Sequence, residues 1–116
     1  MSLEMSADDT LTATLYPGDP LHYTDFSGEG SCKPCKLIRV NVPRAGMFEV
    51  HFILLPQSTD FALSIETNRF SRQVGCCTSD IKGVYTIEAG PVKLYVYTRL
   101  GSLVRNQSFE LTTALR

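Results

Sequence analysis

Two stretches of this sequence share one arrangement, an Ala-Gly turn followed by a long run of alternating apolar and polar residues. The first run covers residues 47–55 after Ala45-Gly46, and the second covers residues 91–98 after Ala89-Gly90. Glycine adopts backbone torsions that other residues resist, and a period of two places successive side chains on opposite faces of a strand. The pattern predicts half-buried antiparallel strands and constrains the chain to an all-β fold.

Shorter alternating runs, separated by turn residues, occupy much of the remaining sequence. They predict strands at residues 11–16, 36–42, 60–67, 84–87 and 105–113, with one short strand near 22–26. Residues 68–83 are polar and carry no clear period, and helical periodicity is weak throughout. About eight strands with this spacing predict an antiparallel two-sheet β-sandwich with jelly-roll or Greek-key connections.

The chain length of 116 residues is that of a single domain. Met1-Ser2-Leu3 resembles residues left by an expression vector, so we expect residues 1–10 to be this scar and an N-terminal linker, and residues 11–116 to be one domain. The 12 acidic and 11 basic residues give a net charge of −1, which provides no field to attract nucleic acid. No apolar run is long enough to span a membrane, so we expect no membrane insertion.

Several of these segments, in this order, resemble the bacterial pre-peptidase C-terminal (PPC-like) domain, a β-sandwich found beside secreted peptidases and other exported enzymes. The matching segments are residues 14–19, 38–50, 60–65, 88–98 and 109–112. One departure is Pro91-Val92, where that family usually has an aromatic residue. The resemblance implies a non-catalytic accessory module of a secreted or cell-surface bacterial protein. Its expected partners are neighbouring domains of a longer parent protein, a polysaccharide or an extracellular protein.

Four cysteines form the one reactive-looking group, Cys32-Lys33-Pro34-Cys35 and the adjacent Cys76-Cys77. We expect disulfides, for example Cys32 and Cys35 each bonded to one of the adjacent pair, although four cysteines allow three connectivities. A bond from Cys35 to Cys76 would close a loop of about 40 residues, worth roughly 4 kcal/mol. Disulfides would place the chain in an extracellular, cell-surface or periplasmic compartment.

Two other chemistries use the same cysteines. A zinc site would use the CxxC spacing, but adjacent cysteines rarely both reach one tetrahedral metal. A thioredoxin-like redox centre would need a helix after the first cysteine, where this sequence predicts a strand. A small zinc or redox protein built on the four cysteines is therefore kept as an alternative to the disulfide-bonded module.

Outward-facing side chains of the predicted strands offer a second candidate site. Tyr95 and Tyr97 share the phase opposite Leu94 and Val96, so their rings are expected to point away from the main core, as is His51 on another strand. Such a face could stack on sugar rings, which makes a carbohydrate-binding module the alternative function. The competing interpretation is that the two rings pair across strands or lie under a loop.

The sequence contains no recognisable catalytic motif, and we expect no catalytic residues. Asp19 and Asp25 are calcium candidates, since some relatives of such domains bind calcium, but EF-hand spacing is absent and turn formation is the favoured role. We therefore expect no cofactor, with calcium as the alternative and zinc disfavoured. A purely structural protein without a ligand is a further alternative.

Overall fold

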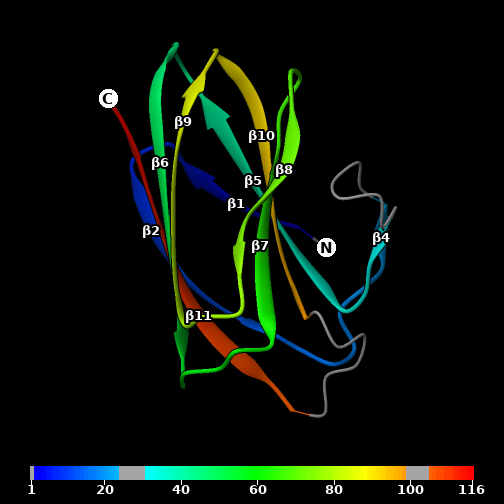
Figure 1. Ribbon diagram of the computed structural model, residues 1–116. Helices are drawn as coiled ribbons and strands as arrows, with labels where there is room; N and C mark the ends of the chain where they lie inside the picture. The colour runs from blue at the N-terminus through cyan, green and yellow to red at the C-terminus, as the bar shows by residue number, and fades with distance from the viewer. Residues whose placement is uncertain (1, 24–30, 99–104) are drawn as a thin grey trace.

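Two β-sheets pack face to face in the computed structural model, which describes residues 2–23, 31–98 and 105–116 (Figure 1). The five-stranded sheet has the order β1 (Ser2–Ser6), β5 (Cys35–Val42), β10 (Gly90–Thr98), β7 (Phe61–Glu66) and β8 (Ser71–Cys76). The four-stranded sheet has the order β2 (Asp9–Leu15), β11 (Gln107–Leu115), β6 (Gly46–Leu55) and β9 (Asp80–Ile87). Two short strands, β3 (His22–Tyr23) and β4 (Ser31–Cys32), pair separately, and we call them the β3–β4 ribbon.

The strand order is that of a jelly roll. Of the eight strands β2 and β5 to β11, the first, eighth, third and sixth form one sheet, and the second, seventh, fourth and fifth form the other. The prediction of a two-sheet antiparallel sandwich with about eight strands is confirmed. The described residues form no helix that could cross a membrane.

The main core fills the space between the two sheets. Alternate residues of β6, from Phe48 to Leu54, and of β10, from Val92 to Val96, are buried there, as the period of two predicts. Phe52 of β6 packs on Phe109 of β11 with ring centroids 5.4 Å apart. Burying a large apolar side chain stabilises the fold by about 1.5–3 kcal/mol, so this core is the main source of stability.

Two strands differ from the sequence-based expectation. β1 lies within residues 1–10, which were expected to be a scar and a linker, and it pairs in parallel with β5 so that Met5 enters the main core opposite Val40. β8 lies within the unpatterned residues 68–83. Its alternation is hidden because it is an edge strand whose register shifts at a β-bulge opposite Leu63 and Ser64.

Candidate functional site

The candidate site is the outer face of the five-stranded sheet, which is divided into two different halves. One half carries the cysteine–tyrosine cluster, a second set of buried side chains on the opposite side of the sheet from the main core. It contains Cys32, Cys35, Leu37, Ala62, Tyr95 and Tyr97, with Cys76 packed against it. The strand register explains the grouping, because Tyr97 of β10 lies beside Cys35 of β5 and Ala62 of β7, and Ala62 lies beside Cys76 of β8.

All four cysteines are in disulfides, but the pairing differs from the example expected from the sequence. Cys32 bonds to Cys35 and Cys76 bonds to Cys77, so each bond is local and no bond joins the two pairs. The described residues contain no free thiol. The two pairs are nevertheless neighbours in space, because the folding of the sheet brings Cys32, Cys35 and Cys76 into one cluster.

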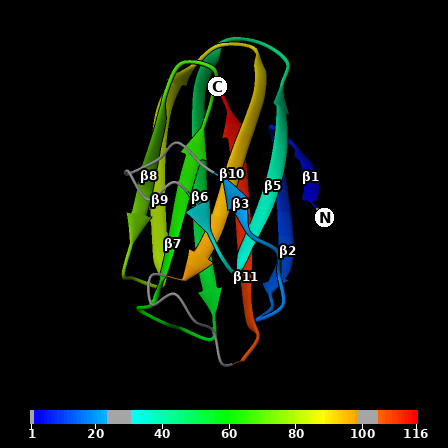
Figure 2. The same cartoon turned by 90° about the vertical axis from the view of Figure 1, so that its right-hand side faces the viewer.

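The tyrosines point away from the main core as predicted, but the expectation of an exposed face is corrected. Tyr95 and Tyr97 are only 2% and 3% exposed. The β3–β4 ribbon lies beyond the five-stranded sheet in Figure 1 and in front of it in Figure 2. The ring of His22 in this ribbon meets the ring of Tyr95 edge-on, with centroids 6.3 Å apart. The interpretation in which a loop covers the rings is therefore the one that the structure supports.

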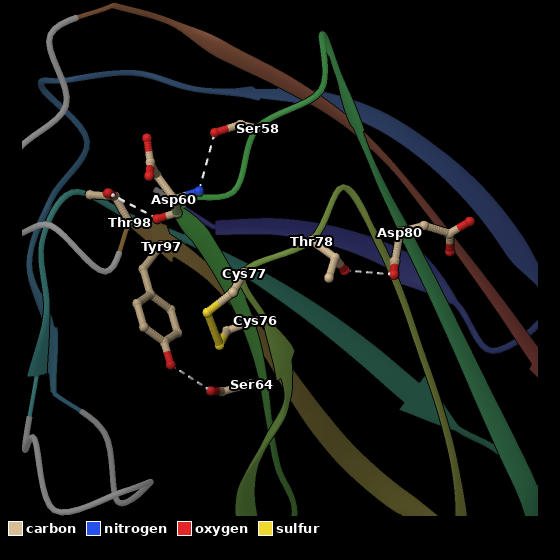
Figure 3. Close-up of a disulfide and its surroundings, with 9 residues drawn as sticks. All are labelled: Ser58, Asp60, Ser64, Cys76, Cys77, Thr78, Asp80, Tyr97 and Thr98. Carbon is tan, nitrogen blue, oxygen red and sulfur yellow. Dashed lines mark hydrogen bonds between the residues drawn. A yellow bond between two sulfur atoms is a disulfide. The ribbon is translucent and has the colours of Figure 1, made fainter.

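The hydroxyl groups of both tyrosines form hydrogen bonds with side chains of the same sheet. The Tyr97 hydroxyl and the Ser64 hydroxyl are hydrogen-bonded at 3.0 Å, next to the Cys76–Cys77 disulfide (Figure 3). The Tyr95 hydroxyl donates to Glu66 Oε1 at 3.4 Å. These bonds allow two phenol groups to be buried without losing hydrogen-bond partners.

His22 of the β3–β4 ribbon lies against the covered half of this face. Burial lowers the pKa of its imidazole, and the nearby cations Arg39 and Lys93 lower this pKa further while Asp19 opposes them. The neutral ring is therefore favoured in the folded protein, which suits its position against the Tyr95 ring.

His51, which was grouped with the two tyrosines, lies on a different face. It belongs to β6 in the four-stranded sheet, whereas Tyr95 and Tyr97 belong to β10 in the five-stranded sheet. Its Nε2 lies 2.7 Å from Asp80 Oδ1, and its side chain is about one-third exposed. The alternation in the sequence shows which side chains of one strand share a face, but it does not show which sheet the strand joins. The expectation that His51 shares a face with Tyr95 and Tyr97 is therefore wrong.

The structure describes one of the two calcium candidates, Asp19, and it shows this residue in a turn. Asp19 Oδ2 accepts a hydrogen bond from the backbone N–H of Tyr16 at 2.8 Å, the contact of a turn-forming aspartate, and the same carboxylate is 3.0 Å from Lys36 Nζ. Asp25 lies outside the described residues. Among the described residues, no three or more His, Cys, Asp or Glu side chains form a group that could hold a metal.

The open half of the outer face carries charged and polar side chains that sequence reasoning missed. Register places Arg39 of β5 between Glu4 of β1 and Lys93 of β10, and Lys93 lies 3.7 Å from Glu66 of β7. A cavity of about 680 Å3 lies over this part of β1, β5 and β10. The sequence does show outward polar residues on these strands, but it does not show that the strands are neighbours.

No family model and no curated protein matches this sequence. Among solved structures, the pre-peptidase C-terminal domain of a collagenase from Bacillus anthracis superposes with a TM-score of 0.69 at 13% identity, covering 97% of this chain and 94% of that one. This chain has a PPC-like fold. The resemblance expected from the order of its strands and turns is confirmed at the level of structure.

Two other similar structures are exported proteins by their descriptions. A periplasmic inhibitor of g-type lysozyme from Salmonella Typhimurium has a TM-score of 0.58 at 11% identity, covering 99% of this chain and all of that one. A surface-associated copper-binding protein from Methylomicrobium album BG8 has the same TM-score at 7% identity, with coverages of 99% and 98%. At these identities the similarity concerns the fold alone.

Proposed function

We propose that this chain is a non-catalytic module of an exported protein and that it binds an extracellular polymer. The observation that carries the proposal is the construction of the outer face of the five-stranded sheet. Two local disulfides and a buried aromatic cluster fill one half of this face, and the other half is left open as a polar surface on three bonded strands. A rigid, exposed surface of this kind binds a partner at low entropic cost.

The cysteine chemistry supports an exported location. Disulfides persist in oxidising compartments and are rare in the cytosol. The similar structures include one domain of a collagenase and a periplasmic inhibitor, both consistent with a small exported module.

The alternative of a zinc or redox protein built on the four cysteines is disfavoured by the same residues. A cysteine binds a metal through its thiolate, and the sulfur atoms of all four cysteines here are bonded in pairs. Cys32 and Cys35 are also buried, which hinders the approach of an attacking thiolate.

The alternative of a carbohydrate-binding module acting through Tyr95 and Tyr97 needs a different contact surface. Both rings are covered in the folded protein, so a polymer would not stack on them. The open half of the same face is the surface that a polymer can reach.

Retention on insoluble polymers tests the proposal. The oxidised protein is incubated with cellulose, chitin, peptidoglycan and fibrillar collagen, and the bound fraction is compared with that of serum albumin as a non-binding protein. Saturable retention on at least one polymer is the expected result. Retention no greater than that of albumin on all four would contradict the proposal.

A further inference from the structure

We infer that the open half of the outer face is a binding cleft for a neutral, hydroxyl-rich saccharide chain, an inference that rests on the polymer-binding function proposed above. The cleft has a volume of about 680 Å3. Its polar lining comes from Glu4 and Ser6 of β1, Asp9 of β2, Arg39 and Asn41 of β5, and Lys93 of β10. This volume lies within the range of about 300–1,000 Å3 that is usual for small-ligand sites.

The floor of the cleft is rigid. Its three strands are hydrogen-bonded neighbours, and the inward side chains Met5, Val40 and Val92 are anchored in the main core. The outward side chains therefore stand on a fixed lattice, about 4.8 Å apart between strands and about 6.8 Å apart along one strand. A site on paired strands is more precisely positioned than a site on loops.

The charges of the lining cancel. The lining contains two carboxylates, Glu4 and Asp9, and two cations, Arg39 and Lys93. Glu66 lies 3.7 Å from Lys93 beside the cleft, so the whole group is close to neutral and has no strong field that would select a polyanion or a polycation. This balance argues against nucleic acid and acidic glycans and favours an uncharged ligand.

The hydrogen-bonding groups of the lining suit sugar hydroxyls. Carboxylates accept, guanidinium and ammonium groups donate, and the Asn41 amide does both. A sugar hydroxyl is itself both donor and acceptor, so adjacent hydroxyls on one ring match neighbouring groups of opposite kind. The ring of Pro91 adds a small apolar surface at the same place.

Two smaller cavities among the described residues fit a saccharide less well. One, of about 120 Å3, lies between residues 67–70 and 86–92, and Arg69 and Glu88 in its lining are ion-paired at 2.8 Å. The other, of about 340 Å3, lies over β6 and β9 beside His51 and Lys82. Each offers a chain of sugar rings less room than the cleft over β1, β5 and β10.

The test is a titration of 15N-labelled protein with cellohexaose, chitohexaose and mannohexaose, followed by amide chemical shifts. Oligogalacturonate serves as the charged comparison ligand. We expect saturable shifts for at least one neutral oligosaccharide, concentrated at residues 39–41 and 91–93. Arg39→Ala and Asn41→Ala should each weaken binding by about tenfold, since each removes hydrogen bonds to the ligand.

Arg69→Ala is the matched control, because it removes the same charge at an exposed position outside the cleft. It should leave the affinity unchanged. If Arg39→Ala loses the dispersed spectrum of the folded protein, Asn41→Ala decides the test.

Three results would overturn the inference. Shifts confined to β6 and β9 would place the saccharide elsewhere and leave the polymer-binding function standing. Tighter binding of oligogalacturonate than of every neutral oligosaccharide would contradict the neutral ligand. The absence of oligosaccharide binding would reject the inference alone if a polymer such as collagen is retained, and would reject both proposals if no polymer is retained.

Discussion

The main core and the cysteine–tyrosine cluster lie on opposite faces of the same five-stranded sheet and are built differently. The main core is apolar and is closed by the second sheet. The cluster combines disulfides with two hydrogen-bonded phenols and is covered in part by the β3–β4 ribbon. Strand β10 contributes to both, with Leu94 and Val96 on one face and Tyr95 and Tyr97 on the other. A side chain that points away from the main core is therefore not necessarily exposed to solvent.

The main core should be the region most sensitive to substitution. Phe52→Ala removes a fully buried ring packed on Phe109, so it should lower the free energy of unfolding by about 3–5 kcal/mol. Urea denaturation followed by circular dichroism measures this value. Met47→Ala, at an exposed position on the same strand, is the control and should change stability by less than about 1 kcal/mol. Similar losses for the two variants would contradict the assigned core.

The next effect comes from the disulfides of the cluster. Cys32→Ala combined with Cys35→Ala opens a loop of only four residues, so the chain-entropy model gives a loss of roughly 2 kcal/mol. A bond closing about 40 residues would give roughly 4 kcal/mol instead. Urea denaturation of this variant, with the parent protein as reference, distinguishes the two values. A loss near the larger value would favour bonds between the two cysteine pairs.

A smaller loss of stability is expected when the buried hydroxyl of Tyr97 is removed. Tyr97→Phe removes the partner of the Ser64 hydroxyl and leaves that buried group unsatisfied, which should cost about 1–2 kcal/mol. Tyr16→Phe, at an exposed tyrosine, should have almost no effect on the same urea curve. If both changes are silent, the hydrogen bond in the cluster does not contribute to stability.

Much of the fold could be predicted from the sequence, because alternation reports directly on burial against a second sheet. The strands around residues 36–42, 47–55 and 92–98 were found for this reason. β8 was missed because it is a polar edge strand with a bulge, and β1 because Met1-Ser2-Leu3 was interpreted as residues left by an expression vector.

The candidate site was harder to predict than the fold. The tyrosines were correctly placed away from the main core, but their cover comes from β3 and β4, which belong to a Gly-, Ser- and Pro-rich stretch without a pattern. The row that places Arg39 between Glu4 and Lys93 depends on strand order, which local periodicity does not contain. The disulfide connectivity is one of the three that four cysteines allow, and the sequence does not choose among them.

The smallest effect is a dependence of stability on pH through the ribbon. Folding lowers the pKa of His22 below the value of about 6.5 that it has in the unfolded chain. As the pH falls, His22 is therefore protonated in the unfolded chain before it is protonated in the folded protein. Stability should therefore decrease on acidification from pH 7 to 5, and His22→Gln should remove this part of the decrease. Urea midpoints across that range measure it. A His22→Gln curve parallel to that of the parent protein would contradict the lowered pKa.

Two local disulfides that share one cluster without joining each other are the central feature of this molecule. To test them, the protein is denatured in urea with N-ethylmaleimide to block exchange, digested with trypsin without reductant, and analysed by mass spectrometry. Residues 1–36 and residues 73–82 should appear as separate peptides, each about 2 Da lighter than its reduced form because a disulfide removes two hydrogens. A single species joining these two peptides would contradict the local pairing, and N-ethylmaleimide adducts on the four cysteines would contradict the disulfide-bonded cluster itself.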